Sequence, residues 1–354
     1  MNAPVDVVDT PAQGAALPLP PLVVLQPLAA WLETHGLGHG PLTATRIGAG
    51  HSNATFLLEH GPRRMVLRRA PRPPLPPSAH DMLREARALD ALQGRARVPE
   101  LLAVCRDDDV LGVPFYVMEE LRGHVVTDDL PAVLGTPDAR RRAGHDLVDA
   151  LAELHAVDVD AAGLGDFGRA EGYLERQVRR FAALWEDGAT RELPLVGELA
   201  GWLEATLPRS AGAGVVHGDY RLGNVMLDLE SPRVRALLDW ELATLGDPLA
   251  DLGYLVATYT DAFSERTVLD LSRVTSSEGF PSRAELVERY AERSGRGVGA
   301  LAWYETLALW KGAVFCEGLY ARFLRGESAD AWSAGLAEGV PGLLRAAAAA
   351  AERF

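Results

Sequence analysis

Three polar side chains with the chemistry to bind a metal ion and activate a hydroxyl group follow one another in the second half of the chain. Asp219 and Asn224 are five residues apart, and Asp239 follows fifteen residues later. One carboxylate can accept or orient the proton of an attacking hydroxyl, while an amide oxygen and a second carboxylate hold Mg²⁺ against phosphate oxygens. The pattern indicates phosphoryl transfer, with Asp219 as the base and Asn224 and Asp239 as metal ligands.

Each of these residues also has a purely structural explanation. Asp and Asn are frequent in turns because their short side chains hydrogen-bond to the nearby backbone, and both His217–Asn224 and the end of the apolar run at Asp239 are expected turns. The catalytic interpretation is favoured because all three residues occur in this order, beside short β-like runs that can pair as a hairpin. Such a hairpin would bring the three side chains to one end.

The elements that must position these residues divide the chain into two parts. From Thr45 short apolar runs alternate with turns, and one segment of helical periodicity, His80–Gly94, interrupts them. After Gly123 long helical patterns dominate, broken by three short β-like pieces. We therefore expect an α+β protein with a small β-rich N-lobe at residues 23–120 and a larger helical C-lobe at residues 121–354.

Several features of the chain favour a cytoplasmic location. Residues 1–22 are rich in Pro, Ala and Gly without apolar periodicity, which predicts a disordered leader and not a signal peptide. No uncharged apolar run reaches the roughly 18 residues of a membrane span. Cys105 and Cys316 lie far apart, outside any CxxC or Cys/His cluster, so neither a disulfide framework nor a zinc site is expected.

The charge of the chain limits its partners. A formal net charge of −14 and a pI near 5.1 argue against nucleic acid or an anionic membrane as the main partner, because either would repel the protein at long range. An acidic groove can still attract a cationic substrate. The expected partners are therefore a nucleotide and a small molecule.

A glycine-rich segment lies between the first two expected strands of the N-lobe. It contains Gly48, Gly50, Ser52 and Asn53. Glycines let the backbone N–H groups approach phosphate oxygens, although an ordinary hairpin turn would use the same residues and the full glycine triplet of nucleotide loops is absent. The position of this segment ahead of Asp219 favours a phosphate-binding loop.

A phosphate-binding cation is expected on the strand after this loop, with a glutamate on the following helix to hold it. Lysine is not available, since Lys311 is the only lysine of the chain. Arg68 occupies the expected position and Glu85 is its expected partner. Arg69 points to the other face of the strand and remains a rival for the phosphates. A solvent-facing arginine on an edge strand is the structural alternative.

At these residues the chain resembles the aminoglycoside phosphotransferase and choline kinase-like superfamily, and within it the kinase-like domain that some organisms carry fused to acyl-CoA dehydrogenases. The resemblance extends over about Leu25 to Arg325 and includes IGAGHSNATFLLE, GYLERQVRRFAALW and DWELATLGDPLADLGYL. The Asp-to-Asn step also matches that of the kinase catalytic loop. The resemblance implies a bilobal protein-kinase-like fold, ATP and Mg²⁺ as cofactors, and a small-molecule hydroxyl as the phosphate acceptor.

The resemblance also implies roles for further residues. The backbone of a hinge at Met118–Leu121, which includes Glu119 and Leu121, would bind adenine, and Asp251 would tie the catalytic loop, His217–Asn224, in place. His217 is expected to support the loop, because Asp219 already serves as the base, and His155 is expected to be a buried structural histidine.

The identity of the acceptor is left open by the sequence. Relatives of the fused domain are associated with hydroxyacyl-CoA phosphorylation, which implies a functional link to an acyl-CoA dehydrogenase. Lys311, Arg322 and Arg325 lie at helical spacing to line a groove for the CoA moiety, and Glu241 is a further candidate acceptor contact. An aminoglycoside or another amino alcohol would instead require clustered carboxylates.

A nucleotide-binding pseudokinase or sensor is the alternative from another functional class. The intact set of Asp219, Asn224 and Asp239 argues against it, because a protein without transfer chemistry has no need of all three residues. The choice between ATP and GTP stays open.

Overall fold

Two compact units make up the part of the chain that the computed structural model describes, residues 5–48, 53–73, 80–210, 212–261, 266–327 and 330–354. Unit 1 comprises Met1–Gly94 and Val98–Arg122, and unit 2 comprises Arg95–Arg97 and Gly123–Phe354. The division at Arg122 falls two residues after the expected end of the N-lobe. Nothing in the sequence indicated that Arg95–Arg97 would belong to unit 2.

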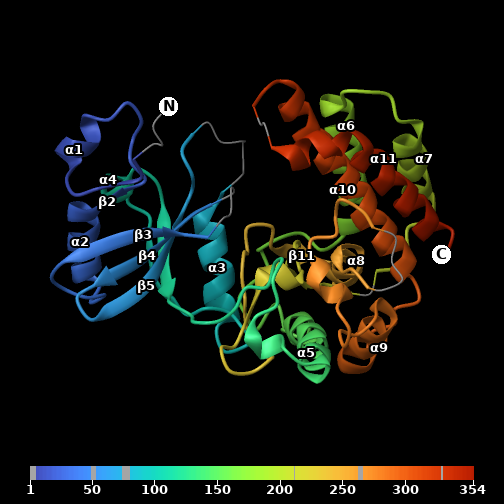
Figure 1. The fold of residues 1–354 in the computed structure, drawn as a ribbon, viewed down its shortest axis with the longest axis horizontal. Coiled ribbons are helices and arrows are strands. Elements are labelled where there is room, and N and C mark those ends of the chain that lie inside the picture. The colour runs from blue at the N-terminus through green and yellow to red at the C-terminus, as the bar shows by residue number, and fades with distance from the viewer. Residues whose placement is uncertain (1–4, 49–52, 74–79, 211, 262–265, 328–329) are drawn as a thin grey trace. The chain divides into compact units, whose positions relative to one another are not determined.

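Unit 1 is built on a five-stranded antiparallel sheet (Figure 1). Its strands lie in the spatial order β3 (Leu42–Ile47), β4 (Ala54–His60), β5 (Arg63–Arg69), β7 (Phe115–Glu119) and β6 (Leu101–Cys105). Gly61 and Pro62 form the two-residue turn between β4 and β5, where Gly61 adopts the positive φ of 57° that such turns require. This turn joins β4 and β5 into a hairpin.

Helices pack against this sheet. Helix α3 (Met82–Leu92) begins at Asp81, whose side chain accepts a hydrogen bond from Arg84 N, and it contacts β6 and β7. Helix α2 (Leu25–Thr34) buries Leu28 and Leu32 in the same apolar core as strand residues such as Phe56. The short helix α4 (Asp108–Leu111) precedes β7.

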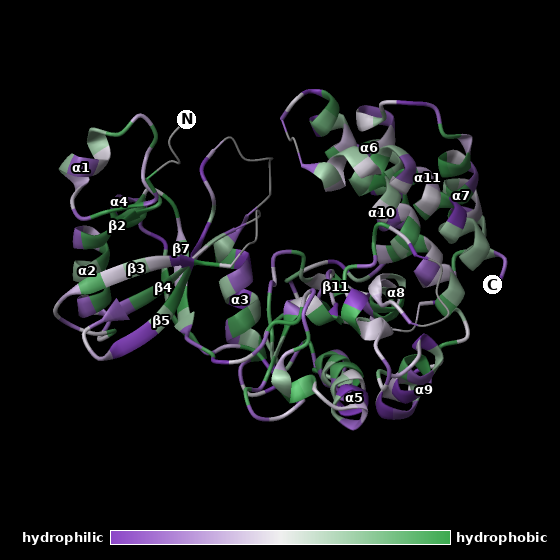
Figure 2. Ribbon diagram, viewed as in Figure 1, coloured by the Kyte–Doolittle hydropathy of each residue, from purple (hydrophilic) through white to green (hydrophobic). Residues whose placement is uncertain are grey.

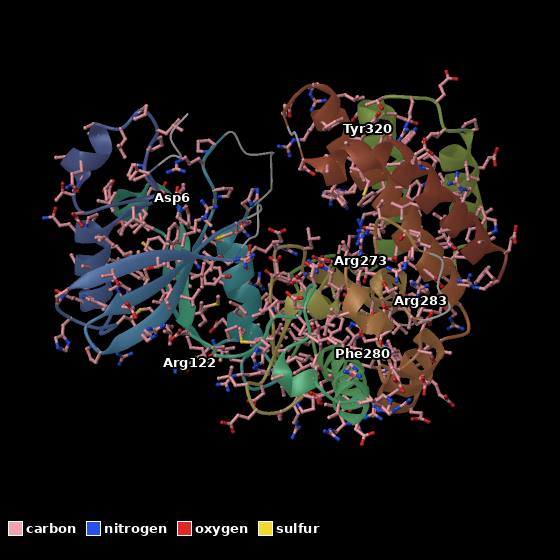
Figure 3. All side chains as sticks on the ribbon, in the orientation of Figure 1. Asp6, Arg122, Arg273, Phe280, Arg283 and Tyr320 are labelled. Carbon is pink, nitrogen blue, oxygen red and sulfur yellow. The ribbon has the colours of Figure 1, made fainter. Side chains whose placement is uncertain are left out.

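The prediction of a disordered leader is wrong for residues 5–22. Strand β1 (Val7–Val8) pairs with β2 (Val23–Val24), and α1 (Pro11–Ala15) begins with a capping box at Thr10. Asp6, labelled in Figure 3, forms ion pairs of 2.7 Å with both Arg46 and Arg72. These elements are too short to show a period in the sequence, and tertiary contacts hold them.

Unit 2 is mainly helical. Its helices are α5 (Pro137–His155), α6 (Tyr173–Gly188), α7 (Pro194–Ala205), α8 (Leu249–Thr258), α9 (Arg283–Ser294), α10 (Leu301–Leu324) and α11 (Ala331–Ala351). Helix α10 contacts α6, α7, α8 and α11 and buries Trp303 and Trp310. In Figure 2 helix α9 is coloured mainly as hydrophilic, in keeping with the two residues that it buries, Leu286 and Tyr290.

Two small antiparallel pairs interrupt these helices. Strand β8 (Gly214–Val216) pairs with β11 (Thr244–Gly246), and β9 (Val225–Leu227) pairs with β10 (Val234–Leu237). The first pair flanks the loop with Asp219, and the second leads to Asp239. The predicted α+β fold, with a β-rich first part and a helical second part, is confirmed. Among the described helices, none combines the length and the hydropathy needed to cross a bilayer.

Candidate active site

The loop between β8 and β9 joins Asp219 to Asn224. The side-chain nitrogen of Asn224 donates to the backbone carbonyl of Asp219 over 2.8 Å and to its carboxylate oxygen Oδ2 over 2.6 Å. A carboxamide has two N–H donors, so the loop uses both of them. The amide oxygen of Asn224 is therefore the atom that remains to bind a cation.

Asp239 lies beside Asn224 in the backbone. Leu238 N donates to the carbonyl of Asn224 over 2.9 Å, and Asp239 follows with a φ of 67°, a left-handed conformation that Asp adopts more readily than most residues. Mg²⁺ binds carboxylate and amide oxygens and takes its other ligands from phosphate and water. The oxygens of Asn224 and Asp239 fit this ion. The described residues contain no cluster of three or more His, Cys, Asp or Glu side chains that could hold a metal.

The carboxylate of Asp251 on α8 holds the start of the loop His217–Asn224. It accepts backbone hydrogen bonds from His217 N over 2.7 Å and Gly218 N over 2.8 Å, and it lies 3.2 Å from His155 Nε2. Burial opposes its charge, but the hydrogen bond from His155 and the nearby His155 and His217 rings outweigh burial and hold the pKa of Asp251 below its usual value. Gly218 has a φ of 88°, and a Cβ there would meet the carbonyl oxygen of Leu242 at 2.8 Å.

The two histidines of this region have structural partners. His217 is buried, its Nε2 lies 2.9 Å from the carbonyl of Leu238, and its Nδ1 accepts a hydrogen bond from Asp219 N. His155 is also buried and hydrogen-bonds to Tyr290 through Nδ1. These contacts agree with the prediction that both histidines are structural.

A cavity of about 300 Å³ opens within unit 2 beside Asp219. Asp219, Glu241 and Lys311 are three of the charged residues that line it. Much of the wall is aromatic or aliphatic and includes Tyr173, Phe181, Tyr254, Tyr304, Leu307 and Phe315. The cavity has the size and the mostly apolar wall of a small-molecule site.

Arg322 does not line the cavity that Lys311 lines, contrary to the prediction that both residues line one basic groove. Arg322 lies eleven positions after Lys311 on α10, a rise of about 16 Å along the helix. Arg322 and Arg325 are exposed and both pair with Glu327. Lys311 instead lines the cavity and donates to Gln177 over 2.8 Å. Helical spacing placed these residues on one face, but it could not show that the cavity ends before Arg322.

In unit 1 the predicted pair of Arg68 and Glu85 is present. Arg68 Nε lies 3.0 Å from Glu85 Oε2. Tyr116 Oη and Asn53 Nδ2 also donate to this carboxylate, over 3.0 and 2.8 Å. Glu85 is fully buried, so these donors compensate the loss of its hydration. Asn53, which the sequence assigned to the nucleotide, thus has its side chain engaged with α3.

Arg69 is used differently from its neighbour. Its guanidinium donates to the backbone carbonyls of Leu22, Ala70 and Leu111. Burial, with a smaller contribution from Arg72, lowers the pKa of Arg69 to about 10. Arg69 therefore ties together backbone segments inside unit 1, which leaves Arg68 as the candidate for the phosphates.

Other nucleotide-site predictions are placed only in part. Gly48 has a φ of 79° at the end of β3, while Gly50 and Ser52 lie outside the described residues. Glu119 ends β7 and exchanges hydrogen bonds with Glu100, and Leu121 follows outside any helix or strand. The backbone there remains a candidate for adenine.

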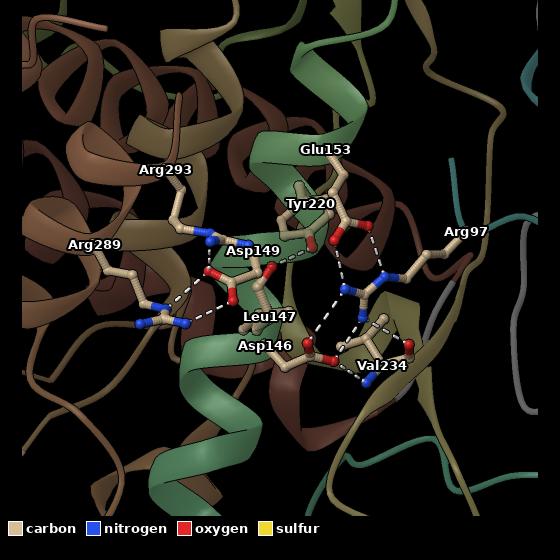
Figure 4. Close-up of polar contacts among 9 residues, drawn as sticks. All are labelled: Arg97, Asp146, Leu147, Asp149, Glu153, Tyr220, Val234, Arg289 and Arg293. Carbon is tan, nitrogen blue, oxygen red and sulfur yellow. Dashed lines mark hydrogen bonds and ion pairs between the residues drawn. The ribbon is translucent and has the colours of Figure 1, made fainter. Parts of the chain in front are cut away.

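Sequence reasoning missed Tyr254, which lines the cavity, Gln177, which contacts Lys311 in its wall, and the structural residue Arg97. Tyr254 lies one turn after Asp251 on α8 and lines the same cavity as Asp219. Burial first, and then the Asp219 carboxylate, raises the pKa of Tyr254 well above its usual value. The spacing from Asp251 was a usable signal for it. The sequence contained no comparable signal for Gln177 or Arg97, because both contact residues that are distant in sequence. Arg97 binds the carboxylates of Asp146 and Glu153 (Figure 4).

A β-rich unit and a helical unit, the second with an Asp–Asn loop that opens on a small-molecule cavity, are the architecture of a phosphotransferase. A model of the phosphotransferase enzyme family matches residues 43–286, and the chain belongs to this family.

The chain is also similar to individual proteins. Acyl-CoA dehydrogenase family member 11 of Rattus norvegicus is 34% identical over 319 residues, which are 86% of this chain and 40% of the relative. The chain thus spans about two fifths of that protein. A solved structure from Ralstonia eutropha JMP134, described as an aminoglycoside phosphotransferase, has a TM-score of 0.79 and 30% identity over 93% of this chain and 98% of that one.

A third similarity concerns the fold alone. A thermostable mutant of an aminoglycoside phosphotransferase, solved with ADP and hygromycin B, is 16% identical, with a TM-score of 0.57 over 89% of this chain and 97% of that one.

Proposed function

We propose that this chain transfers a phosphoryl group from ATP to the hydroxyl of a small molecule. The observation that carries the proposal is the position of Asp219, whose carboxylate is held by Asn224 and lines the cavity of unit 2. Asp219 accepts the proton of the acceptor hydroxyl while that oxygen attacks the γ-phosphorus of ATP. The bond to the β–γ bridging oxygen breaks, and ADP leaves with its electron pair.

The remaining site residues serve the nucleotide. Asn224 and Asp239 are the residues that would hold Mg²⁺, which neutralises charge on the phosphates when bound. Arg68, held by Glu85, contacts the phosphates, and the backbone at Gly48, Gly50 and Ser52 contributes N–H groups. The backbone at Glu119 and Leu121 binds adenine.

The acceptor that we favour is a hydroxyacyl thioester such as a hydroxyacyl-CoA. A polycationic aminoglycoside needs several uncommitted carboxylates. Among the described residues, the acidic side chains that line the cavity are Asp219, Glu241 and Asp251, and the carboxylate of Asp251 already binds the backbone of His217 and Gly218. The naming of a relative as an acyl-CoA dehydrogenase family member supports a link to acyl-CoA chemistry. Phosphorylation would turn the hydroxyl of the acyl chain into a phosphate, which is a better leaving group than hydroxide in a later step.

An aminoglycoside or amino-alcohol kinase is the second candidate, supported by the description of the Ralstonia eutropha protein. Incubation with Mg-ATP and a panel of hydroxyacyl-CoAs, aminoglycosides, choline and homoserine, followed by mass spectrometry, separates the two. We expect a gain of one phosphoryl group on a hydroxyacyl-CoA. If nucleotide binds but no compound gains phosphate, the chain is a nucleotide sensor and the proposal is wrong.

A further inference from the structure

Lys311 is the one lysine among 35 basic residues, and it lies in the wall of the cavity that contains Asp219. All the other basic residues among these 35 are arginines. A compact ammonium therefore occurs at one place in the chain, where it lines a cavity. Arginine carries a longer and broader head group that keeps its charge, so it would fill more of a 300 Å³ space.

The surroundings of Lys311 leave room for another partner. Its Nζ donates to Gln177 Oε1 over 2.8 Å and lies 4.7 Å from the centre of the Phe181 ring. An ammonium has three N–H donors, and among the described residues the hydrogen-bond acceptor of Lys311 is Gln177 Oε1. Burial first, and then Arg180, lowers the pKa of Lys311 to about 8, against the opposing effect of Asp251. A charge in such a wall is costly unless another oxygen compensates it.

Asp219 and Lys311 line the same cavity, and the wall that they share is largely aromatic and aliphatic. A ligand that satisfies both must carry a hydroxyl for the carboxylate, an apolar body, and an acceptor oxygen for the ammonium. The volume suits a short chain, so only the acyl part of a larger thioester would enter it.

We propose that Lys311 determines acceptor specificity by donating a hydrogen bond to a carbonyl or carboxylate oxygen of the acceptor, whose hydroxyl lies at Asp219. This inference rests on the proposed phosphotransferase function and narrows its substrates to hydroxy compounds that carry such an oxygen. Diols and amino alcohols of the same length lack it and bind more weakly.

Steady-state kinetics on matched compounds test the inference. The set contains hydroxyacyl-CoAs with the hydroxyl at different carbons, the free hydroxy acids and the corresponding diols. We expect Lys311→Met to raise the KM of the thioester and the acid by about 10–100-fold, the range for a lost hydrogen bond to a charged group, while the KM of the diol and of ATP changes less than about twofold. Arg345→Met, which removes an exposed cation from α11, is the control.

Chemical labelling tests the same contact without a substitution. Reductive methylation modifies amines, and the chain has a single side-chain amine, so peptide mass spectrometry reports Lys311 directly. We expect a free hydroxy acid that is a substrate to slow labelling of Lys311, and the matching diol to leave it unchanged.

The possible outcomes distinguish a failure of the proposed function from a failure of the role assigned to Lys311. If no compound is phosphorylated, the proposed function is wrong. If hydroxy acids are phosphorylated but neither protect Lys311 nor discriminate between the wild type and Lys311→Met, the function stands and the role of Lys311 is wrong. Should Lys311→Met not fold, Lys311→Gln and the labelling of the wild type provide the same decision.

Discussion

Asn224 turns its amide nitrogen toward Asp219, with 2.6 Å between Nδ2 and the carboxylate oxygen Oδ2. One contact thus orients two functional groups at once. It fixes the carboxylate that lines the cavity of unit 2, and it directs the amide oxygen of Asn224 away from Asp219, where a cation can bind. The two roles assigned to this loop are therefore coupled by its own geometry.

Replacing Asp219 by Asn should remove turnover and leave the fold intact. Asparagine keeps an oxygen that can accept the hydrogen bond from Asn224, but it cannot take a proton, so kcat should fall about 10²–10⁴-fold. The Mg-ATP-dependent thermal shift should be retained. Asp187→Asn, a change at an exposed position on α6, should retain full turnover. A variant Asp219→Asn that keeps more than about a tenth of the wild-type kcat would contradict the assignment of Asp219 as the base.

Substitutions of Arg68 and Arg69 should have different effects, the first on nucleotide binding and the second on stability. Arg68→Met removes the candidate phosphate contact, so the Kd for Mg-ATP measured by calorimetry should rise about 10–100-fold. Arg69→Met strands the buried carbonyls of Leu22, Ala70 and Leu111, and chemical denaturation should show a loss of roughly 1–3 kcal/mol with little change in Kd. The reverse pattern would make Arg69 the phosphate ligand.

Local sequence patterns predicted those parts of the site that lie within one loop or one hairpin. Asp219 and Asn224 are close because a turn joins them, and Arg68 meets Glu85 because the next helix packs on the sheet. A spacing motif is enough to predict such contacts, because few backbone conformations are compatible with it.

Contacts between distant segments could not be predicted in this way. Lys311 and Gln177 meet only because α6 packs against α10. The segment 5–22 is held by Asp6, which pairs with Arg46, and by the carbonyl of Leu22, which accepts a hydrogen bond from Arg69. No local sequence pattern predicts either contact. Composition alone predicted disorder for that segment, because composition contains no information about tertiary contacts.

Asp251 should make stability depend on pH in the acid range. Its pKa is lower in the folded protein than the usual value near 3.8, so the unfolded chain takes up a proton first as pH falls. The stabilisation is complete above the unfolded pKa and is lost as pH falls through the folded one. Asp251→Asn should cost roughly 1–3 kcal/mol of unfolding free energy near neutral pH. The difference from the wild type, measured in urea, should shrink below about pH 4; a difference that is constant from pH 7 to pH 3 would contradict this role.

Arg97 should contribute more stability to unit 2 than any local pattern suggests. Figure 4 shows its guanidinium between the carboxylates of Asp146 and Glu153, and it also donates to the carbonyl of Val234. The contacts use all five of its N–H groups. They attach Arg95–Arg97 to α5 and β10.

Arg97→Met should lower the unfolding free energy by roughly 2–4 kcal/mol, because it leaves Asp146 and Glu153 facing each other without a cation. Arg95→Met is the matched control, since Arg95 is exposed and its guanidinium donates to the Ala161 carbonyl over 3.2 Å; it should cost less than about 1 kcal/mol. A double-mutant cycle with Asp146→Asn should show a coupling of about 1–3 kcal/mol. Additive losses would mean that the ion pair itself is not what holds this segment, and that packing of the Arg97 methylenes is.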